Sequence, residues 1–201
     1  ELMNEVDTVL YFRADRDLQT LSECALDRSF PRLVGNFERL SFGSAACELV
    51  DRLAIDCEPN KQLYRCLSGV LGALGEVSDL QLEPVFWYYQ LRDAEALGYR
   101  PELRECISCQ VELSGTWLWF SAALGGGLCS ACGEGQGVRL AGESLRFLSD
   151  LQRLKRYRRE ALPSVPSRCG EIRAALRGFL DYYGGGHTRL KSLDFFDSLA
   201  R

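Results

Sequence analysis

The hydrophobic and polar positions near the start of the chain follow the pattern of two β-strands. Residues 7–12 (DTVLYF) are rich in β-branched and aromatic side chains, and residues 18–24 (LQTLSEC) follow after a polar stretch. Two strand-like segments joined by a short polar connection predict a β-hairpin. Because two strands alone are marginally stable in water, we expect this hairpin to need further strands or a helical surface.

After the hairpin the hydrophobic period becomes helical. The apolar positions predict one or two helices over residues 33–53, with a break near residues 41–43, and one amphipathic helix over residues 63–74. Pro84 stands where the first turn of another helix tolerates proline, and Gly98 is where that helix is expected to end. This part of the chain is therefore expected to be all-helical.

The downstream part of the chain also shows helical spacing. Apolar side chains recur every three residues over residues 143–162, which predicts one long helix. Residues 167–183 and 191–199 predict two more helices, and the three glycines at 184–186 separate them. The hydrophobic pattern as a whole predicts a mainly α-helical fold preceded by a short β-hairpin.

Two cysteine pairs lie between the two helical parts. Cys106 and Cys109 form one C-x2-C pair, Cys129 and Cys132 form a second, and 19 residues separate the pairs. This spacing is typical of structural zinc sites, in which four thiolates fill a tetrahedral shell and leave no open position for a substrate. We therefore predict one structural zinc ion held by these four cysteines.

The residues around these pairs predict a small β-containing module over residues 103–135. Residues 116–120 (TWLWF) have the composition of a strand, and a glycine turn follows at residues 125–127. On that strand Trp117 and Trp119 share one face. These indoles could stack on nucleic-acid bases, but more often such side chains cover the hydrophobic underside of a zinc module. We expect a zinc ribbon or treble clef.

The other five cysteines fall mostly in segments with a strand or helix pattern. An odd total of nine cysteines argues against a disulfide framework. We expect these five to act as small apolar residues. A redox role for one C-x2-C pair remains an alternative, although redox chemistry would not need a second matched pair. The five are Cys24, Cys47, Cys57, Cys66 and Cys169.

Several classes of protein are disfavoured. An uncharged run of 21 residues lies between Glu112 and Glu134, but its five glycines argue against a membrane span. The single histidine, His187, excludes multi-histidine metal centres, and the lysines lack the glycine context of a phosphate loop. We therefore expect neither a membrane protein nor an enzyme.

Charge is unevenly distributed along the chain. The net charge is −4, with −8 over residues 1–105 and +4 over residues 106–201. The helix predicted over residues 143–162 carries six cations against three acidic residues. We expect these cations to contact DNA phosphates or an acidic peptide tail, with a merely solvated face as the alternative. The six are Arg146, Arg153, Lys155, Arg156, Arg158 and Arg159.

Residues around the cysteine pairs resemble those of a known family, the bacterial recombination mediator RecO. The similarity is most specific from Leu97 to Cys132 and extends more weakly over most of residues 7–200. The specific segments are 97–101 (LGYRP), Leu103, the first cysteine pair, 119–121 (WFS) and 125–132 (GGGLCSAC). The weaker ones are 46–49 (ACEL), 63–74, His187 and 190–193 (LKSL) with Phe195 and Phe196.

This resemblance implies a function in DNA repair and homologous recombination. RecO-like proteins bind single-stranded DNA, anneal complementary strands, and act with RecR to load RecA onto strands coated by single-strand-binding protein. They also engage the acidic C-terminal tail of that coating protein. The four cysteines match the family's zinc ligands one for one. A RecO-like protein would act in the bacterial cytoplasm, at the nucleoid.

The resemblance also implies a domain organisation. RecO-like proteins begin with an OB-type barrel, which needs five strands, and only two strands are predicted here. We therefore expect residues 1–28 to be the last strands of an incomplete OB barrel and residues 29–201 to form a helical domain with the zinc module. A zinc-ribbon adaptor that binds only protein, without intrinsic DNA binding, remains the alternative.

Overall fold

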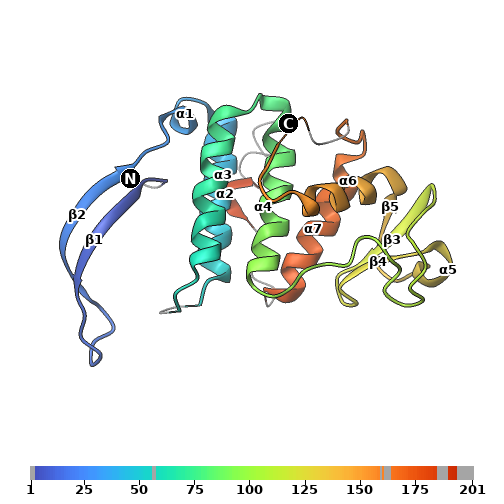
Figure 1. The fold of residues 1–201 in the computed structure, drawn as a ribbon, viewed down its shortest axis with the longest axis horizontal. Helices are drawn as coiled ribbons and strands as arrows, with labels where there is room; N and C mark the ends of the chain where they lie inside the picture. Colours follow the sequence, from blue (N-terminus) through green and yellow to red (C-terminus); the bar gives the residue numbers. More distant parts are fainter. Residues whose placement is uncertain (1–2, 56–57, 159, 161–163, 185–189, 194–201) are drawn as a thin grey trace.

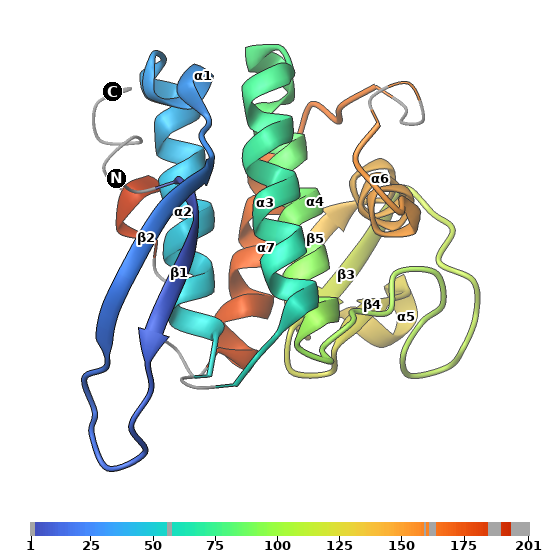
Figure 2. The same ribbon diagram turned by 60° about the vertical axis from the view of Figure 1, so that its left-hand side comes forward.

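The computed structural model describes residues 3–55, 58–158, 160, 164–184 and 190–193. The hairpin projects from one end of the molecule, a group of upright helices forms the middle, and the cysteine-containing module lies at the other end (Figure 1). The same order is visible after rotation (Figure 2). The structure confirms the predicted fold class: a mainly helical chain with a small four-cysteine module and a β-hairpin.

The predicted hairpin is present at the N-terminal end. Strands β1 (Glu5–Tyr11) and β2 (Thr20–Arg28) pair antiparallel. Apolar side chains are exposed along both strands: Val9 is 50% exposed, Tyr11 66% and Leu21 53%. The hairpin is held at its base, where the hydroxyl groups of Ser68 and Tyr64 donate hydrogen bonds to Glu5 at 2.5 and 3.3 Å.

The first group of helices begins with one correction to the sequence prediction. The sequence predicted a break near residues 41–43, but one continuous helix runs through Phe42 and Gly43. The chain instead breaks earlier, at Gly35 and Asn36, and the Asn36 side chain accepts a hydrogen bond from the Arg39 N–H at 3.0 Å. This is an ordinary N-cap. The helices are α1 (Pro31–Val34), α2 (Phe37–Leu53), α3 (Lys61–Glu76), the 3-10 helix η1 (Asp79–Gln81) and α4 (Leu82–Ala96).

Helix α4 is buried around most of its circumference. Phe86 packs against Phe42 of α2, with ring centroids 5.6 Å apart. The Tyr89 hydroxyl donates to the Ala46 carbonyl at 3.0 Å. On another side, Trp87 meets Phe147 edge to face at 6.0 Å. These contacts make α4 the centre of one continuous core.

The cysteine-containing module is built on a three-stranded antiparallel sheet. The predicted strand is confirmed as the central strand, and two flanking strands were not predicted. The sheet order is β4-β3-β5. Phe120 of the central strand packs against Phe179, which joins the module to the helical core. The elements are β3 (Trp117–Ser121), β4 (Gly126–Leu128), α5 (Ser130–Gly133) and β5 (Val138–Ala141).

The prediction of one long helix over residues 143–162 is wrong in length, because the observed helix is shorter. Helix α6 covers Gly142–Arg153, and Leu154 already has an extended backbone. The Arg92 guanidinium donates a hydrogen bond to the Leu154 carbonyl, so a side chain from α4 satisfies a group left unpaired at the helix end. This long-range contact has no signature in the local sequence.

The final predicted helices have different outcomes. Helix α7 (Cys169–Tyr183) agrees with the prediction for residues 167–183. Of the helix predicted over residues 191–199, residues 191–193 are helical and the rest lie outside the described residues. Within the described part of the chain, no helix is both long enough and apolar enough to span a bilayer.

The N-cap of α2 leads to a testable prediction. Replacing the cap oxygen in Asn36→Ala leaves the Arg39 N–H without its acceptor, and we expect the free energy of unfolding to fall by about 1 kcal/mol. Urea unfolding followed by far-UV circular dichroism measures this change. The matched variant Asn36→Asp keeps an acceptor and should unfold like the original chain, so an equal loss in both variants would contradict the capping role.

Candidate metal centre

The fold brings the four predicted cysteines together at one point. The Sγ atoms of Cys106, Cys109, Cys129 and Cys132 all lie within 4.8 Å of one another. Cys106 is buried, whereas Cys109 is exposed. The first pair lies on the loop before the sheet, and the second lies at and within the short helix α5. The two C-x2-C pairs of the sequence therefore form one cluster, which could hold a metal ion.

The sulfur geometry fits a tetrahedral ion. The Sγ atoms of Cys109 and Cys129 are 3.7 Å apart, far longer than the S–S bond of a disulfide. Bonds of about 2.3 Å from zinc to each sulfur place tetrahedral ligands about 3.8 Å apart. The observed separation matches that edge, so the residues fit a zinc module.

Backbone hydrogen bonds shape each cysteine pair into a tight turn. The Gln110 N–H donates to the Cys106 carbonyl at 2.8 Å, and Gln110 has a positive φ of 62°. In the second pair, the Gly133 N–H donates to the Cys129 carbonyl at 2.9 Å. Both turns bring the sulfur atoms of their pair to the same side, as a shared ion requires.

Gly133 is needed for close packing. A Cβ atom on Gly133 would lie 2.5 Å from Cβ of Trp119, well inside contact distance. The absence of a side chain therefore lets α5, with the second cysteine pair, rest on the central strand. Trp119 thus belongs to the support of the metal centre, in agreement with the interpretation that these indoles pack against the module.

The thiols influence one another's ionisation. Burial disfavours the charged form of Cys106, but N–H groups of Cys129, Cys109 and Ser108 donate to its sulfur and lower the pKa to about 6. Hydrogen bonds with Cys109 and Cys129 raise the pKa of the Cys132 thiol to about 12. The four sulfurs therefore share protons in the absence of a metal ion. A divalent cation displaces these protons when it binds.

Trp117, the other indole on this face, contacts two cations. The guanidinium carbons of Arg139 and Arg168 lie 4.3 and 4.8 Å from the centroid of its ring. Arg168 also pairs with Glu171 at 3.3 Å. The aromatic surface that a stacked base would need therefore already packs against guanidinium groups.

The cations predicted to bind polyanions do not form one helical face. Arg146 and Arg153 lie on α6, where Glu143 and Asp150 bring the charge of the helix to zero. The other described cations come after the end of α6, where the chain is no longer helical. They are Lys155, Arg156 and Arg158, and all three are exposed. Arg159 and His187 lie outside the described residues, as does Cys57.

Two of these cations join others that the sequence analysis missed. Lys155 and Arg156 line a cavity of about 600 Å³ together with Arg28, Arg65 and Arg92. The five side chains come from β2, α3, α4 and the segment after α6. No spacing rule connects positions so far apart in the sequence, so only the tertiary structure identifies this cluster.

The metal centre predicts the effect of losing one ligand. Cys129→Ser removes a thiolate from a shell that contributes on the order of 10 kcal/mol of apparent binding free energy, and we expect the metal content to fall well below one ion per chain. Elemental analysis of the purified protein measures the metal, and tryptophan fluorescence reports on Trp119. Cys24→Ser, an exposed cysteine on the hairpin, is the control and should keep its ion. Full metal content in Cys129→Ser would contradict the four-thiolate site.

Comparisons with known proteins agree with this architecture. The sequence model of the family described as "Recombination protein O C terminal" matches residues 34–194. The DNA repair protein RecO of Symbiobacterium thermophilum is 33% identical over 207 residues, which cover 99% of this chain and 78% of that protein. The RecO of Exiguobacterium is 31% identical over 198 residues, covering 98% of this chain and 76% of that protein.

The extent of the match differs between relatives. The RecO of Pelotomaculum thermopropionicum is 38% identical over 120 residues, covering 60% of this chain but only 45% of that protein. The aligned region thus spans from less than half to about three quarters of these relatives. The family match nevertheless covers helices α2 to α7 and the whole metal centre. The chain therefore belongs to the RecO family of DNA repair proteins.

Proposed function

We propose that this chain is a recombination mediator that binds single-stranded DNA, anneals complementary strands, and helps RecR to load RecA onto strands coated by single-strand-binding protein. The observation that carries the proposal is the family match over residues 34–194, which includes the assembled four-cysteine cluster. The role is to bring partners together, without bond chemistry of its own, at the bacterial nucleoid.

The ion in this proposal is zinc, with a structural role. Four thiolates are a donor set that favours zinc, and they leave no open coordination position for a substrate or an activated water. Bound zinc would supply charge neutralisation and rigidity. Cys106, Cys109, Cys129 and Cys132 would hold the loop before β3 and the helix α5 in their observed positions.

The hairpin is proposed to be the end of a larger barrel. Residues 1–28 would supply the last strands of an OB-type barrel, and residues 29–201 the helical domain with its module at residues 103–135. The exposure of apolar side chains such as Val9 and Leu21 supports this assignment, because unpaired strands with apolar surface need a covering partner.

The exposed cations beyond the cavity are proposed as contacts for polyanions. Arg153 ends α6 and Arg158 follows it, and neither makes an ion pair with any residue that the structure describes. Such side chains can follow the phosphates of a strand. They also suit the acidic C-terminal tail of single-strand-binding protein, which we propose as a second partner of this surface.

A protein-only adaptor is the second candidate function. The net charge of −4 favours it, because a chain of this charge does not attract nucleic acid as a whole. In this case the chain would bind RecR and the coating protein's tail without touching DNA.

Strand annealing separates these two functions. Two complementary oligonucleotides, each coated with the cognate single-strand-binding protein, are mixed with and without this chain, and duplex formation is followed by fluorescence. We expect annealing to accelerate, with an effect that weakens steeply between about 50 and 200 mM salt because phosphate contacts release counterions. No acceleration, with binding to the acidic tail retained, would overturn the mediator and favour the adaptor.

The surface cations give a second prediction. Removing Arg153 and Arg158 as alanine variants should lower the slope of log affinity against log salt by about 1.4 for single-stranded DNA, since each phosphate contact contributes about 0.7. Fluorescence anisotropy across a salt titration measures the slope. The charge-matched control is the double variant Arg104→Ala and Arg177→Ala, both exposed. Equal slopes in the two double variants would remove Arg153 and Arg158 from the DNA contact.

A further inference from the structure

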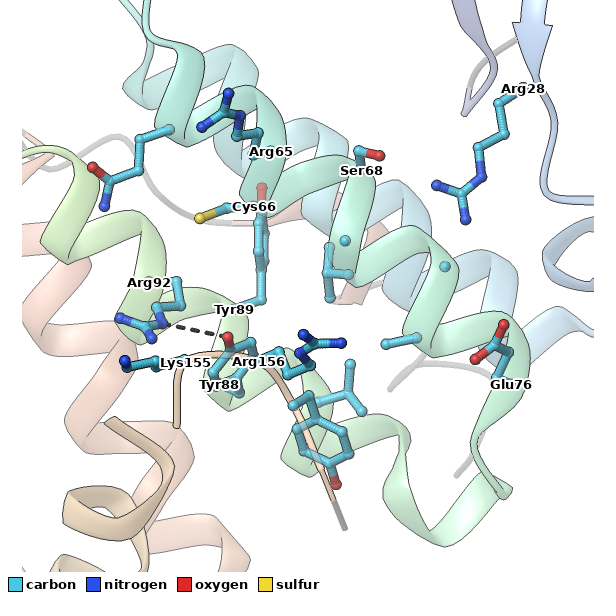
Figure 3. Close-up of a pocket in the computed structure, with 17 residues that line it drawn as sticks. Arg28, Arg65, Cys66, Ser68, Glu76, Tyr88, Tyr89, Arg92, Lys155 and Arg156 are labelled. Atoms are coloured by element: carbon cyan, nitrogen blue, oxygen red, sulfur yellow. Dashed lines mark hydrogen bonds between the residues drawn. The ribbon is translucent and has the colours of Figure 1, made fainter. Parts of the chain in front are cut away.

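The cavity between β2, α3, α4 and the segment after α6 concentrates positive charge in a chain that is negative overall. Arg28, Arg65, Arg92, Lys155 and Arg156 line it, against the single carboxylate of Glu76 (Figure 3). Its volume of about 600 Å³ lies within the range of small-ligand sites. Cations from four separate segments therefore converge on one cavity.

Most of this charge is not neutralised by ion pairs. Arg28 pairs with Glu5 at 3.8 Å, and Arg92 pairs with Glu95. Arg65, Lys155 and Arg156, in contrast, have no carboxylate partner anywhere in the described part of the chain. Like charges that are only partly offset by carboxylates repel one another across the cavity, so an anion in the cavity would relieve that repulsion.

Two residues of the cavity wall also favour an anion: Arg92 presents a fixed positive charge, and Cys66 adds no negative charge. Arg92 is fixed in place, because it donates to the Leu154 carbonyl and to the Tyr88 hydroxyl. Burial raises the pKa of the Cys66 thiol to about 11, so this wall residue carries no negative charge near neutral pH. The remaining wall is partly apolar and includes Val85 and Tyr157.

Gly72 of α3 leaves room for Arg28, the cation that the hairpin contributes to the cavity. A Cβ atom on Gly72 would lie 3.2 Å from a guanidinium nitrogen of Arg28, tighter than an ordinary contact. Without that atom, Arg28 of β2 can lie close to the helix. The cavity is therefore surrounded by cations on the hairpin side as well as on the helical side (Figure 3).

We propose that this cavity binds the terminal phosphate of a single-stranded DNA end, with the attached nucleoside against the apolar wall. This inference rests on the proposed binding of single-stranded DNA and names a site for it. A terminal phosphate is a compact group with a charge of about −1.5 to −2 and three acceptor oxygens. Cations that converge from several sides suit such a group.

Other anions fit the arrangement less well. An internal phosphodiester has two free oxygens, and the strand must continue on both sides of it. The carboxylates of an acidic peptide are spaced along an extended chain and would be matched by cations in a row. Guanidinium groups also form bidentate hydrogen bonds with phosphate oxygens, which Arg65 and Arg156 can supply from opposite segments.

The test compares short oligothymidylates that differ only in their ends. One carries a 5′ phosphate, one a 3′ phosphate, and one hydroxyl groups at both ends, and binding to the full chain is followed by fluorescence anisotropy. We expect one phosphorylated end to bind about tenfold more tightly than the hydroxyl ends, which corresponds to about one additional charge-assisted hydrogen bond. This preference should weaken below about pH 6, where the phosphate gains a proton.

Variants assign the preference to the cavity. Arg65→Ala and Arg156→Ala, both exposed positions, should abolish the preference for the phosphorylated end, whereas Arg177→Ala on α7 should retain it. Equal affinity of all three oligonucleotides would overturn the cavity site while leaving strand binding intact. No binding of any of them would overturn both this site and the proposed DNA binding. Binding of an acidic peptide that depends on Arg65, without any preference for a phosphorylated end, would reassign the cavity to a protein partner.

Discussion

Apolar packing around α4 sets the positions of the other helices and, through α6 and α7, of the cysteine-containing module. This helix contacts α2, α3, α6 and α7, so most of its side chains have no access to water. Even Asp93 is fully buried at 0% exposure, and burial raises the pKa of its carboxyl, which favours the uncharged form. Because α4 belongs to one continuous core, apolar packing fixes α2 and α3 on one side of it relative to α6, α7 and the module on the other. The hairpin strands are attached instead through the hydrogen bonds to Glu5.

The four-cysteine cluster joins two segments that have little regular secondary structure of their own. The loop that carries Cys106 and Cys109 has few regular elements, and α5 has only four residues. A closed four-thiolate shell can hold such segments where helix packing alone would not. The module is nevertheless continuous with the helices, since the Ala141 N–H donates to Glu171 of α7 at 2.8 Å and Gln152 of α6 donates to the Pro101 carbonyl at 2.9 Å.

The placement of charge illustrates how a local pattern and the tertiary structure can diverge. The leucine spacing over residues 143–162 suggests one basic helix, but α6 stops at Arg153 and is neutral as a whole. The hydrogen bond from Arg92 to the Leu154 carbonyl helps the chain to leave the helix. As a result, Lys155 and Arg156 line the cavity, where they join cations from β2, α3 and α4.

The hairpin, most helices and the four metal ligands can be predicted from the sequence, because each depends on short spacings: alternation in strands, the 3.6-residue helical period, and two C-x2-C pairs. The sequence did not locate the start of α2, the end of α6, the two outer strands of the sheet, or the cationic cavity. The start of α2 depends on a local cap, the Asn36 side chain on the Arg39 N–H, which the sequence analysis missed. The other features depend on contacts between distant residues, such as Arg92 with Leu154 or Arg28 beside Gly72. Local periodicity carries no information about such contacts, because they arise only when the core brings the segments together.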